Sequence, residues 1–516
     1  MSSISLPKVN FNIVPGAINV ANAPQKVLLI GQGVGGSVAA GSLTSGIGNG
    51  NEEEALFGRR TMIATMVREF RRINTVSQID VVNIADPITG AVAATSTITF
   101  VGTSTKAGNI EISIQSDRLH KFIVPVAVGS SESTVASSLQ TFLIADDTLL
   151  FTSSVSAGVI TLTAVHTGEE MNNATIKLIT NLDGITNTIT AIAGGEGVVA
   201  IPALNDLVGD TRYQKIVYPA SYDHDIIKTF LDNRFNADNI ILDGVAVLTK
   251  TSDSATLVAD ALTLNSNSIM LNCNKVTDET NLKGGALAEL NVVQSTQFCA
   301  IRSLELTDGT NIAKYRVGNN ILNTTGGDYM AAVPLHNTPI SQLPIIYNNY
   351  GWRIPEQNLL NSNGCTLFGN NVSLTSIIIG DTVTTYQKNA AGISDITFKY
   401  LNYVETSSVI REYFFNNNKQ EFSQKSLTNG DLIAGLPMAN ADSIATYQLS
   451  LYETLAGSKY GLVQAGSQAE TFFKKNLIVT INESTGISTI SMIVPIVTQL
   501  RGINGTMQIG FEINKG

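Results

Sequence analysis

The residues most able to do chemistry are glycines that follow the first apolar segment. Residues 25–30 (QKVLLI) predict a short buried strand, and Gly31, Gly33 and Gly36 follow at the spacing of a dinucleotide-binding loop. Such a loop binds pyrophosphate where a helix opens at its last glycine. Residues 37–51 instead hold further glycines without helical periodicity, and Asp80 starts the next strand, which is a poor position for a ribose ligand. We interpret residues 31–36 as a flexible surface loop without a cofactor, and a dinucleotide-binding α/β enzyme remains a distant alternative.

The other groups with chemical potential are scattered. The four histidines are His120, His166, His224 and His336. Apart from the aspartates that flank His224, none has a Cys, His or carboxylate at metal-ligand spacing, so we expect surface histidines and no metal site. Asp146, Asp147 and residues 52–54 predict solvated charges. The sequence contains no G-x-S-x-G, P-loop or H-E-x-x-H motif, and it therefore predicts no catalytic residue and no enzyme.

Composition restricts the class of protein. A chain of 516 residues predicts roughly three or four domains. Charged residues make up 14%, against roughly 25% in a typical globular chain, which favours a surface that is buried against other protein. The net charge of −10 without a basic run excludes a nucleic-acid binder. Three widely spaced cysteines (Cys273, Cys299 and Cys365) predict a reducing compartment, and no apolar run approaches a membrane span or a signal peptide, so we expect a soluble protein made in the cytoplasm.

Hydrophobic periodicity predicts the elements that must position these residues. Residues 60–73 predict a helix with Met62, Met66, Phe70 and Ile73 on one face. Strands are expected over 78–84, 98–101, 110–114, 121–128, 159–165 and 175–179, with a helix over 134–144, which together predict an inserted β-rich domain. After it, strands over 216–218, 239–242, 269–273 and 297–301 alternate with helices over 223–233, 254–264 and 283–293, a pattern typical of a mostly parallel sheet. Further helices are predicted over 340–350, 396–415 and 440–456.

Both ends of the chain alternate like half-buried strands. Strands are predicted over residues 477–482 and 490–496, with a turn at 483–486. The outermost apolar residues are Val9, Phe11 and Ile13 near the start, and Met507, Ile509, Phe511 and Ile513 near the end. A strand with one apolar face needs a partner for its backbone groups. That partner is either the chain's own sheet or the sheet of a neighbouring copy.

Several ordered motifs resemble the tail sheath proteins of contractile bacteriophages, the Mu-like branch in particular. They are residues 22–30 (NAPQKVLLI), 56–58 (LFG), the Met-rich helix 61–70, 161–164 (TLTA) with 168–169 (GE) and 172–173 (NN), Arg353 with 358–360 (NLL) and 364–366 (GCT), 384–387 (TTYQ) with Gly392 and Asp395, 460–463 (YGLV), 472–474 (FFK), and 494–495 (VP) with 499–501 (QLR). The series runs in family order over nearly the whole chain.

The resemblance implies an α/β multidomain fold with a subtilisin-like α/β sheath core that lacks a protease triad. The expected domains are an N-terminal extended arm (1–20), the core (21–86 and 200–390), an inserted β-rich outer domain (87–199), an α+β tube-proximal C-terminal domain (391–500) and a C-terminal arm strand (501–516). The apolar residues of the two terminal strands become self-assembly strands. Lys459, Lys474 and Lys475 form a local basic cluster in an acidic chain, which is either a solvated face or a contact with the tail tube.

The function implied is that of a structural subunit. It polymerises as a helical homo-oligomer of six-membered rings around the tail tube, and it contracts without nucleotide to drive the tube through the target cell envelope. The partners implied are the tail tube, baseplate and tail terminator proteins, without direct nucleic-acid contact or membrane insertion. The expected location is a virion assembled in the host cytoplasm. The sheath of a phage-derived bacteriocin or injection system is the alternative.

Overall fold

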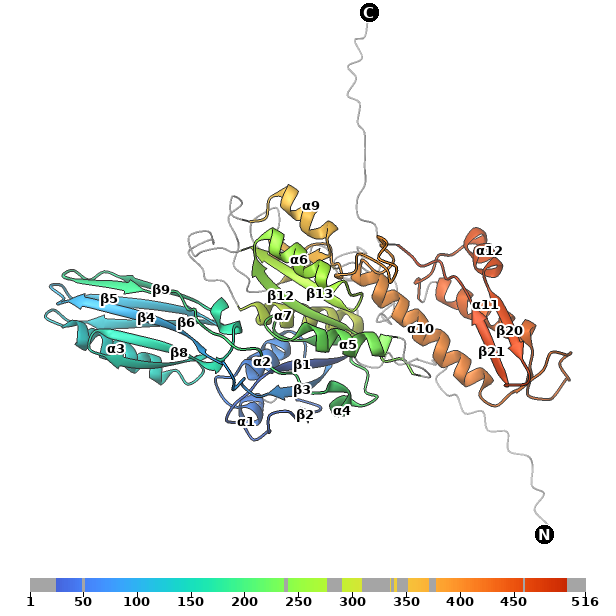
Figure 1. Ribbon diagram of the computed structural model, residues 1–516, viewed down its shortest axis with the longest axis horizontal. Coiled ribbons are helices and arrows are strands. Elements are labelled where there is room, and N and C mark those ends of the chain that lie inside the picture. Colours follow the sequence, from blue (N-terminus) through green and yellow to red (C-terminus); the bar gives the residue numbers. More distant parts are fainter. Residues whose placement is uncertain are drawn as a thin grey trace, which may run out of the picture.

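The fold is described from a computed structural model of the chain. It describes residues 25–48, 52–235, 240–275, 290–308, 335, 338–340, 351–370, 377–457 and 460–498. Figure 1 shows a central core, a β-rich unit that extends from one side of it, and a helical unit with a hairpin on the other side. The chain is a mixed α/β protein with several separate sheets. Among the described residues, no helix is both long enough and apolar enough to cross a membrane.

The core is built on a seven-stranded sheet of order β15-β13-β12-β11-β1-β3-β2. Its strands are β1 (Lys26–Gln32), β2 (Leu43–Thr44), β3 (Gln78–Ile84), β11 (Lys215–Val217), β12 (Val245–Ser252), β13 (Ile269–Lys275) and β15 (Cys365–Thr366). All neighbouring strands are parallel except β2, which runs antiparallel to β3. The alternation of strands and helices therefore correctly predicted a mostly parallel sheet.

Helices cover both faces of this sheet. They are α1 (Glu53–Phe57), α2 (Met62–Ile73), α4 (Leu204–Val208), α5 (His224–Phe235), α6 (Ser254–Leu264), α7 (Asn291–Asp308) and α9 (Ile354–Ser362). Because side chains alternate along a strand, Val27 and Leu29 of β1 pack with α2 and α7, whereas Leu28 and Ile30 pack with α5 and α6. Thr61 caps α2 by accepting a hydrogen bond from Ala64 N.

The inserted unit comprises two antiparallel sheets between β3 and α4, of order β10-β4-β8-β7 and β6-β5-β9. Its elements are β4 (Ala93–Gly102), β5 (Gly108–Gln115), β6 (Leu119–Val126), α3 (Glu132–Ala145), β7 (Phe151–Ser156), β8 (Val159–Thr167), a 3-10 turn η1 (Glu170–Asn173), β9 (Thr175–Thr180) and β10 (Ile185–Ile189). Strands β7 and β10 were not predicted, because their Thr, Ser and Asn residues resemble loop composition.

The C-terminal unit begins with the long helix α10 and ends with a hairpin. Its elements are α10 (Leu401–Phe422), β18 (Ser426–Leu427), β19 (Met438–Ala439), α11 (Ala441–Ala456), α12 (Ser467–Lys475), β20 (Ile478–Asn482) and β21 (Ile487–Ser491). A small sheet of β14 (Pro339–Ile340), β17 (Ile377–Ile379) and β16 (Phe368–Asn370) is formed by segments that precede and follow α9 and β15 of the core. Figure 1 shows α10 leading from the core to the outer part of the unit.

Three of the predicted elements are wrong. Residues 297–301, predicted as a strand, lie inside the helix α7, because a short apolar run does not distinguish a buried strand from a buried helix. The strand predicted over 239–242 is instead β12, which begins at Val245. The strand predicted over 490–496 is instead β21, which begins at Ile487 and ends at Ser491, whereas the helix predicted over 396–415 is confirmed with later bounds as α10. Most of the helices predicted over 283–293 and 340–350 lies outside the described residues, although Asn291 and Val293 belong to α7 and Ile340 to β14.

Candidate functional site

The glycine-rich loop after β1 packs against the chain's own backbone. A Cβ atom at Gly36 would lie 2.2 Å from Leu56 O, and one at Gly58 would lie 2.0 Å from Val34 O. Glycine is therefore needed for a close backbone approach, and Gly58 also has a positive φ of 93°. After Gly36 the chain continues to β2 without a helix, and Gly33 is buried. The interpretation as a flexible surface loop is thus wrong for the buried half of the segment.

The crevice in which open α/β sheets bind ligands is also filled. It lies at the carboxyl ends of β1 and β11, where the strand order reverses. Gln32 Nε2 donates to Asp86 Oδ1 (2.7 Å) and to Thr167 O (2.9 Å) of the inserted unit. Tyr222 OH donates to Gln32 Oε1 (3.2 Å). These residues satisfy one another, and the site does not fit a dinucleotide.

Asp80, the candidate ribose ligand of the enzyme alternative, is bonded to other residues of the core. Its side chain is buried, forms an ion pair with Lys26 (2.9 Å) and accepts a hydrogen bond from Tyr213 OH (2.6 Å). It also accepts from Gly46 N in the loop that precedes α1 (2.9 Å). Asp80 therefore ties three segments together instead of facing a ligand.

Two histidines predicted at the surface are buried and paired with carboxylates. His120 Nε2 lies 2.9 Å from Asp117 and its Nδ1 lies 2.7 Å from Asp146. Burial opposes a charge on His120, but these hydrogen bonds outweigh burial and raise the pKa of its imidazole. The other buried histidine, His166, is bonded to Asp86 (2.8 Å). Sequence spacing missed the pair of His166 and Asp86 because these residues are far apart in the chain. Asp146, predicted as a solvated charge, is instead bonded to His120.

The remaining histidines form no site either. His224 is half-buried beside Tyr218 OH (3.1 Å), and His336 lies outside the described residues. Within the described ranges, no group of three His, Cys, Asp or Glu residues could hold a metal ion. Glu53, grouped with the solvated charges of residues 52–54, is buried at the start of α1.

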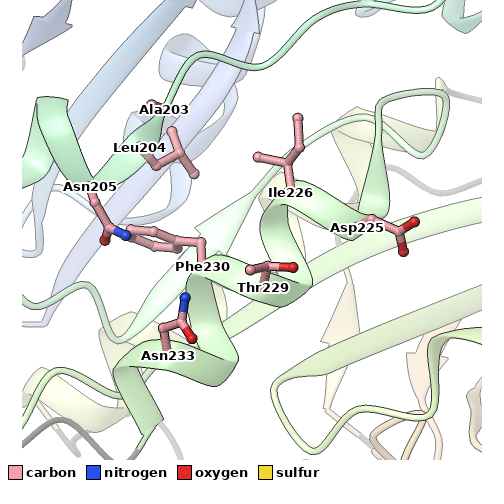
Figure 2. Close-up of a pocket in the computed structure, with 8 residues that line it drawn as sticks. All are labelled: Ala203, Leu204, Asn205, Asp225, Ile226, Thr229, Phe230 and Asn233. Atoms are coloured by element: carbon pink, nitrogen blue, oxygen red, sulfur yellow. The ribbon is translucent and has the colours of Figure 1, made fainter.

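A shallow groove lies between α4 and α5 (Figure 2). Its volume is ≈ 350 Å³, and it is lined by Ala203, Leu204, Asn205, Asp225, Ile226, Thr229, Phe230 and Asn233. Asp225 is the one titratable side chain in this lining. A single exposed carboxylate without a second acid, base or nucleophile gives no basis for catalysis.

The helix α10 is joined to the core by a buried charge cluster. Glu405 lies 2.7 Å from Lys215 Nζ of β11 and accepts from Arg302 Nε of α7 (2.9 Å), and Arg302 also pairs with Glu305 (3.3 Å). Burial alone would raise the pKa of Glu405, but the charges of Arg302 and Lys215 hold it below its usual value. Sequence analysis missed this cluster, although an acid at the start of the apolar face of α10 was a visible signal.

A second, more exposed cluster joins the middle of α10 to the core. Arg212 pairs with Glu412 (2.6 Å) and Asp243 (3.3 Å), and Arg411 pairs with Asp243 (2.9 Å). Arg212 also donates to Ser408 Oγ (2.6 Å). Because two successive segments of α10 are fixed to the core, the C-terminal unit is positioned by a rigid connection.

The outer part of the C-terminal unit is a small core with an incomplete sheet. Tyr452 of α11 stacks on Phe473 of α12 with ring centroids 4.3 Å apart. Strands β20 and β21 pair from Ile478↔Ser491 to Asn482↔Ile487 and, in the part of the chain described, form a sheet of only two strands. Both Ile478 and Ile487 are more than half exposed. A hairpin of this size has two open edges and is marginally stable by itself.

The predicted site residues are only partly placed. The self-assembly residues Val9, Phe11, Ile13, Met507, Ile509, Phe511 and Ile513 lie outside the described residues, as does Lys459. Lys474 and Lys475 are exposed in the last turn of α12, where positive charge interacts favourably with the helix dipole. Lys474 is paired with Glu470, so part of the local positive charge is balanced.

Comparison with known proteins gives one relative that spans most of the chain. No known family profile matches. The tail sheath protein of the Mu-like prophage FluMu from Haemophilus influenzae is 24% identical over 478 residues, which are 87% of this chain and 88% of the relative. The resemblance to the Mu-like tail sheath proteins is confirmed.

Two solved sheath proteins align with nearly the whole length of this chain. A sheath tail protein from Listeria innocua is 11% identical, covers 92% of both chains and has a TM-score of 0.43. The contracted helical sheath of the anti-feeding prophage is 10% identical, covers 98% of this chain and 99% of the other, and has a TM-score of 0.46.

The TTYQ segment of the tail sheath resemblance has a structural role. Thr385 Oγ1 donates to Ser266 O (3.1 Å), and Gln387 N donates to Asn265 Oδ1 (2.9 Å), just after α6. Tyr386 OH donates to Asp395 Oδ2 (2.6 Å). These hydrogen bonds fix the loop that leads from the core towards α10. The side chains of the motif that are named here thus hold the fold together.

Proposed function

We propose that the chain is the repeating subunit of a contractile tail sheath, which polymerises around a tail tube and contracts to drive the tube through the envelope of a target cell. The match to a tail sheath relative over 87% of the chain carries this proposal. The subunit acts structurally, as a component of a virion or phage-like particle assembled in the host cytoplasm. Its partners are further copies in six-membered rings, the tube protein, and the baseplate and terminator proteins at the two ends.

The proposed domains follow the sequence boundaries. The core (21–86 and 200–390) is subtilisin-like, and its seven-stranded, mostly parallel sheet with helices on both faces suits that description. The inserted domain (87–199) faces outward, and the C-terminal domain (391–500) lies against the tube. The arms (1–20 and 501–516) reach neighbouring copies.

Strand addition between subunits is the proposed assembly contact. Within the described residues, sheet β20–β21 has two open edges and exposed isoleucines on one face, and β20 contacts α11. An arm from a neighbouring copy, with Val9, Phe11 and Ile13 or the C-terminal series on one face, would satisfy an edge with backbone hydrogen bonds and fix the register. The arms then keep subunits connected while the domains move.

The motor is the difference between contacts in an extended and a contracted lattice, with no nucleotide consumed. The two charge clusters on α10 support this mechanism, because they favour a subunit that moves as one body and changes its contacts with neighbours. Lys459, Lys474 and Lys475 are the proposed contact with acidic groups of the tube. Exposed ion pairs of roughly 0.2–1 kcal/mol each are weak enough to break on contraction.

Substitution of one face of the N-terminal arm tests the assembly contact. Replacing Val9, Phe11 and Ile13 together with Asn should leave a folded subunit that no longer pellets as a polymer, because the face to be buried is lost. The matched control replaces Lys8, Asn10 and Asn12 with Ser, and it should pellet like the parent. Sedimentation of the Asn variant with the parent would show that the arm does not join subunits.

A further inference from the structure

The inserted unit is joined to the core by hydrogen bonds between the end of β8 and core residues near the carboxyl end of β1. His166, at the end of β8, accepts a hydrogen bond on Nε2 from Met62 N (3.2 Å), the first residue of α2. Its Nδ1 must then carry the proton, and it donates to Asp86 (2.8 Å). His166 therefore bonds to the core through one ring nitrogen and to Asp86 through the other. Together with the Gln32 bonds to Asp86 and Thr167, this pair closes one side of the junction.

Glu170 lies at the other side of the same junction. It begins η1, is only 2% exposed, and accepts a hydrogen bond from Ser221 Oγ in the loop before α5 (3.2 Å). The backbone N–H of Val292, in the first turn of α7, also faces its carboxyl group. One side chain of the inserted unit therefore contacts two elements of the core.

The surroundings of Glu170 do not balance a negative charge. Within the described part of the chain Glu170 forms no ion pair. Burial, together with the negative charges of Glu170 and Asp86, raises the pKa of the Tyr222 phenol well above its usual value. Burial raises the pKa of Glu170 to about 7, although Ser221 and the Val292 N–H favour the charged form.

We propose that Glu170 is a proton-dependent latch between the inserted unit and the core. With its proton the carboxyl group stays in the junction and the unit remains docked. Without the proton, a buried and unpaired carboxylate gains hydration when the junction opens about the two connecting segments, residues 85–92 and 190–203. The proposal goes beyond the sheath function and stands independently of it.

The sign follows from linkage between proton binding and docking. Docking raises the pKa of Glu170 from its ordinary 4.5 to about 7, so its contribution is complete below 4.5 and is lost as the pH rises towards 7. Between pH 5.5 and pH 8, the ratio of open to docked junctions should rise roughly 30-fold. The inserted unit also meets the core at Asp117, which pairs both with His120 and with Arg68 of α2, so the Glu170→Gln variant is needed to assign the pH dependence to Glu170.

Hydrogen exchange of the full-length chain measures this opening even when it is rare. The reporter is the amide of Met62, whose N–H donates to His166 Nε2 across the junction (3.2 Å). Each rate is divided by the intrinsic rate of that amide at the same pH. The protection of the Met62 amide should fall roughly 30-fold from pH 5.5 to pH 8, while that of the α6 amides stays constant. Unchanged protection of the Met62 amide would overturn the proposal.

Two variants separate a latch from a purely structural contact. Glu170→Gln keeps the shape without the charge, and its protection should stay within about threefold over this pH range. The matched control is Glu169→Gln, an exposed neighbour that should behave like the parent. Ser221→Ala removes a bond that favours the charged form, so the midpoint of the transition should move to higher pH. A pH dependence that persists in Glu170→Gln, or a midpoint that does not move in Ser221→Ala, contradicts the latch.

Discussion

Replacing Glu405 with Gln tests the rigid connection between α10 and the core. The substitution keeps the size of the side chain but removes the charge that balances Arg302 and Lys215, whose side chains are 0% and 2% exposed. Removing one partner of a buried ion pair leaves the others uncompensated and costs about 3–5 kcal/mol. Glu305 still pairs with Arg302, which places the expected cost at the lower end of that range. The free energy of opening of α10 should fall accordingly.

The assay is hydrogen exchange of the α10 amides, because a chain of several domains does not unfold in a single step. Glu412→Gln is the matched control on the same helix, where the carboxylate is 40% exposed and the expected loss is about 0–1 kcal/mol. The low pKa of Glu405 adds a pH signature: its contribution is present above its ordinary value of 4.5 and is lost as the pH falls through the lowered value. Equal protection of the α10 amides in the two variants would refute the rigid connection between α10 and the core.

Three further predictions concern the glycine loop, the lysines of the proposed tube contact, and His120. Titration with NAD, NADP or FAD should not raise the melting temperature, because the glycine loop packs on residues 56–58; a saturable shift would restore the enzyme alternative. Changing Lys459, Lys474 and Lys475 together to Glu should leave empty sheaths able to form but unable to hold an extended tube, and normal extended tails in micrographs would remove the tube contact. Because folding raises the pKa of His120, the charged imidazole stabilises the inserted unit fully below pH 6.5, and this contribution is lost as the pH rises through the raised pKa. His120→Asn should therefore lower the melting temperature of the inserted unit more at pH 6 than at pH 9. Equal losses at the two pH values would exclude a stabilising role of the charged imidazole.

Periodicity predicted the elements whose burial repeats along the chain. Helix α2 was predicted from Met62, Met66 and Phe70, and all three are buried. Helix α6 was predicted with its observed bounds, and in the structure Asp253 caps it by accepting hydrogen bonds from Ala255 N and Thr256 N. The strands of the inserted unit with alternating Ile and Thr were recognised for the same reason. Local patterns suffice wherever a single face decides the packing.

Contacts between distant segments could not be predicted in this way. The pairing of His166 with Asp86 and the cluster of Glu405, Lys215 and Arg302 depend on which elements the fold brings together. Residues 297–301 were misassigned because a run buried on every side loses its periodicity. The tail sheath resemblance came from ordered motifs, and the TTYQ motif proved to be a structural tie rather than a chemical site.

Negative-stain electron microscopy of the purified full-length chain tests the sheath function most directly. Subunits that add strands to their neighbours should form long hollow tubes with helical striations and a lumen wide enough for a tail tube. The charge-reversed lysine variant should still form such tubes, whereas the Val9, Phe11 and Ile13 variant should not. Discrete particles of fixed size from the parent chain, at every protein concentration and salt condition, would contradict the sheath function.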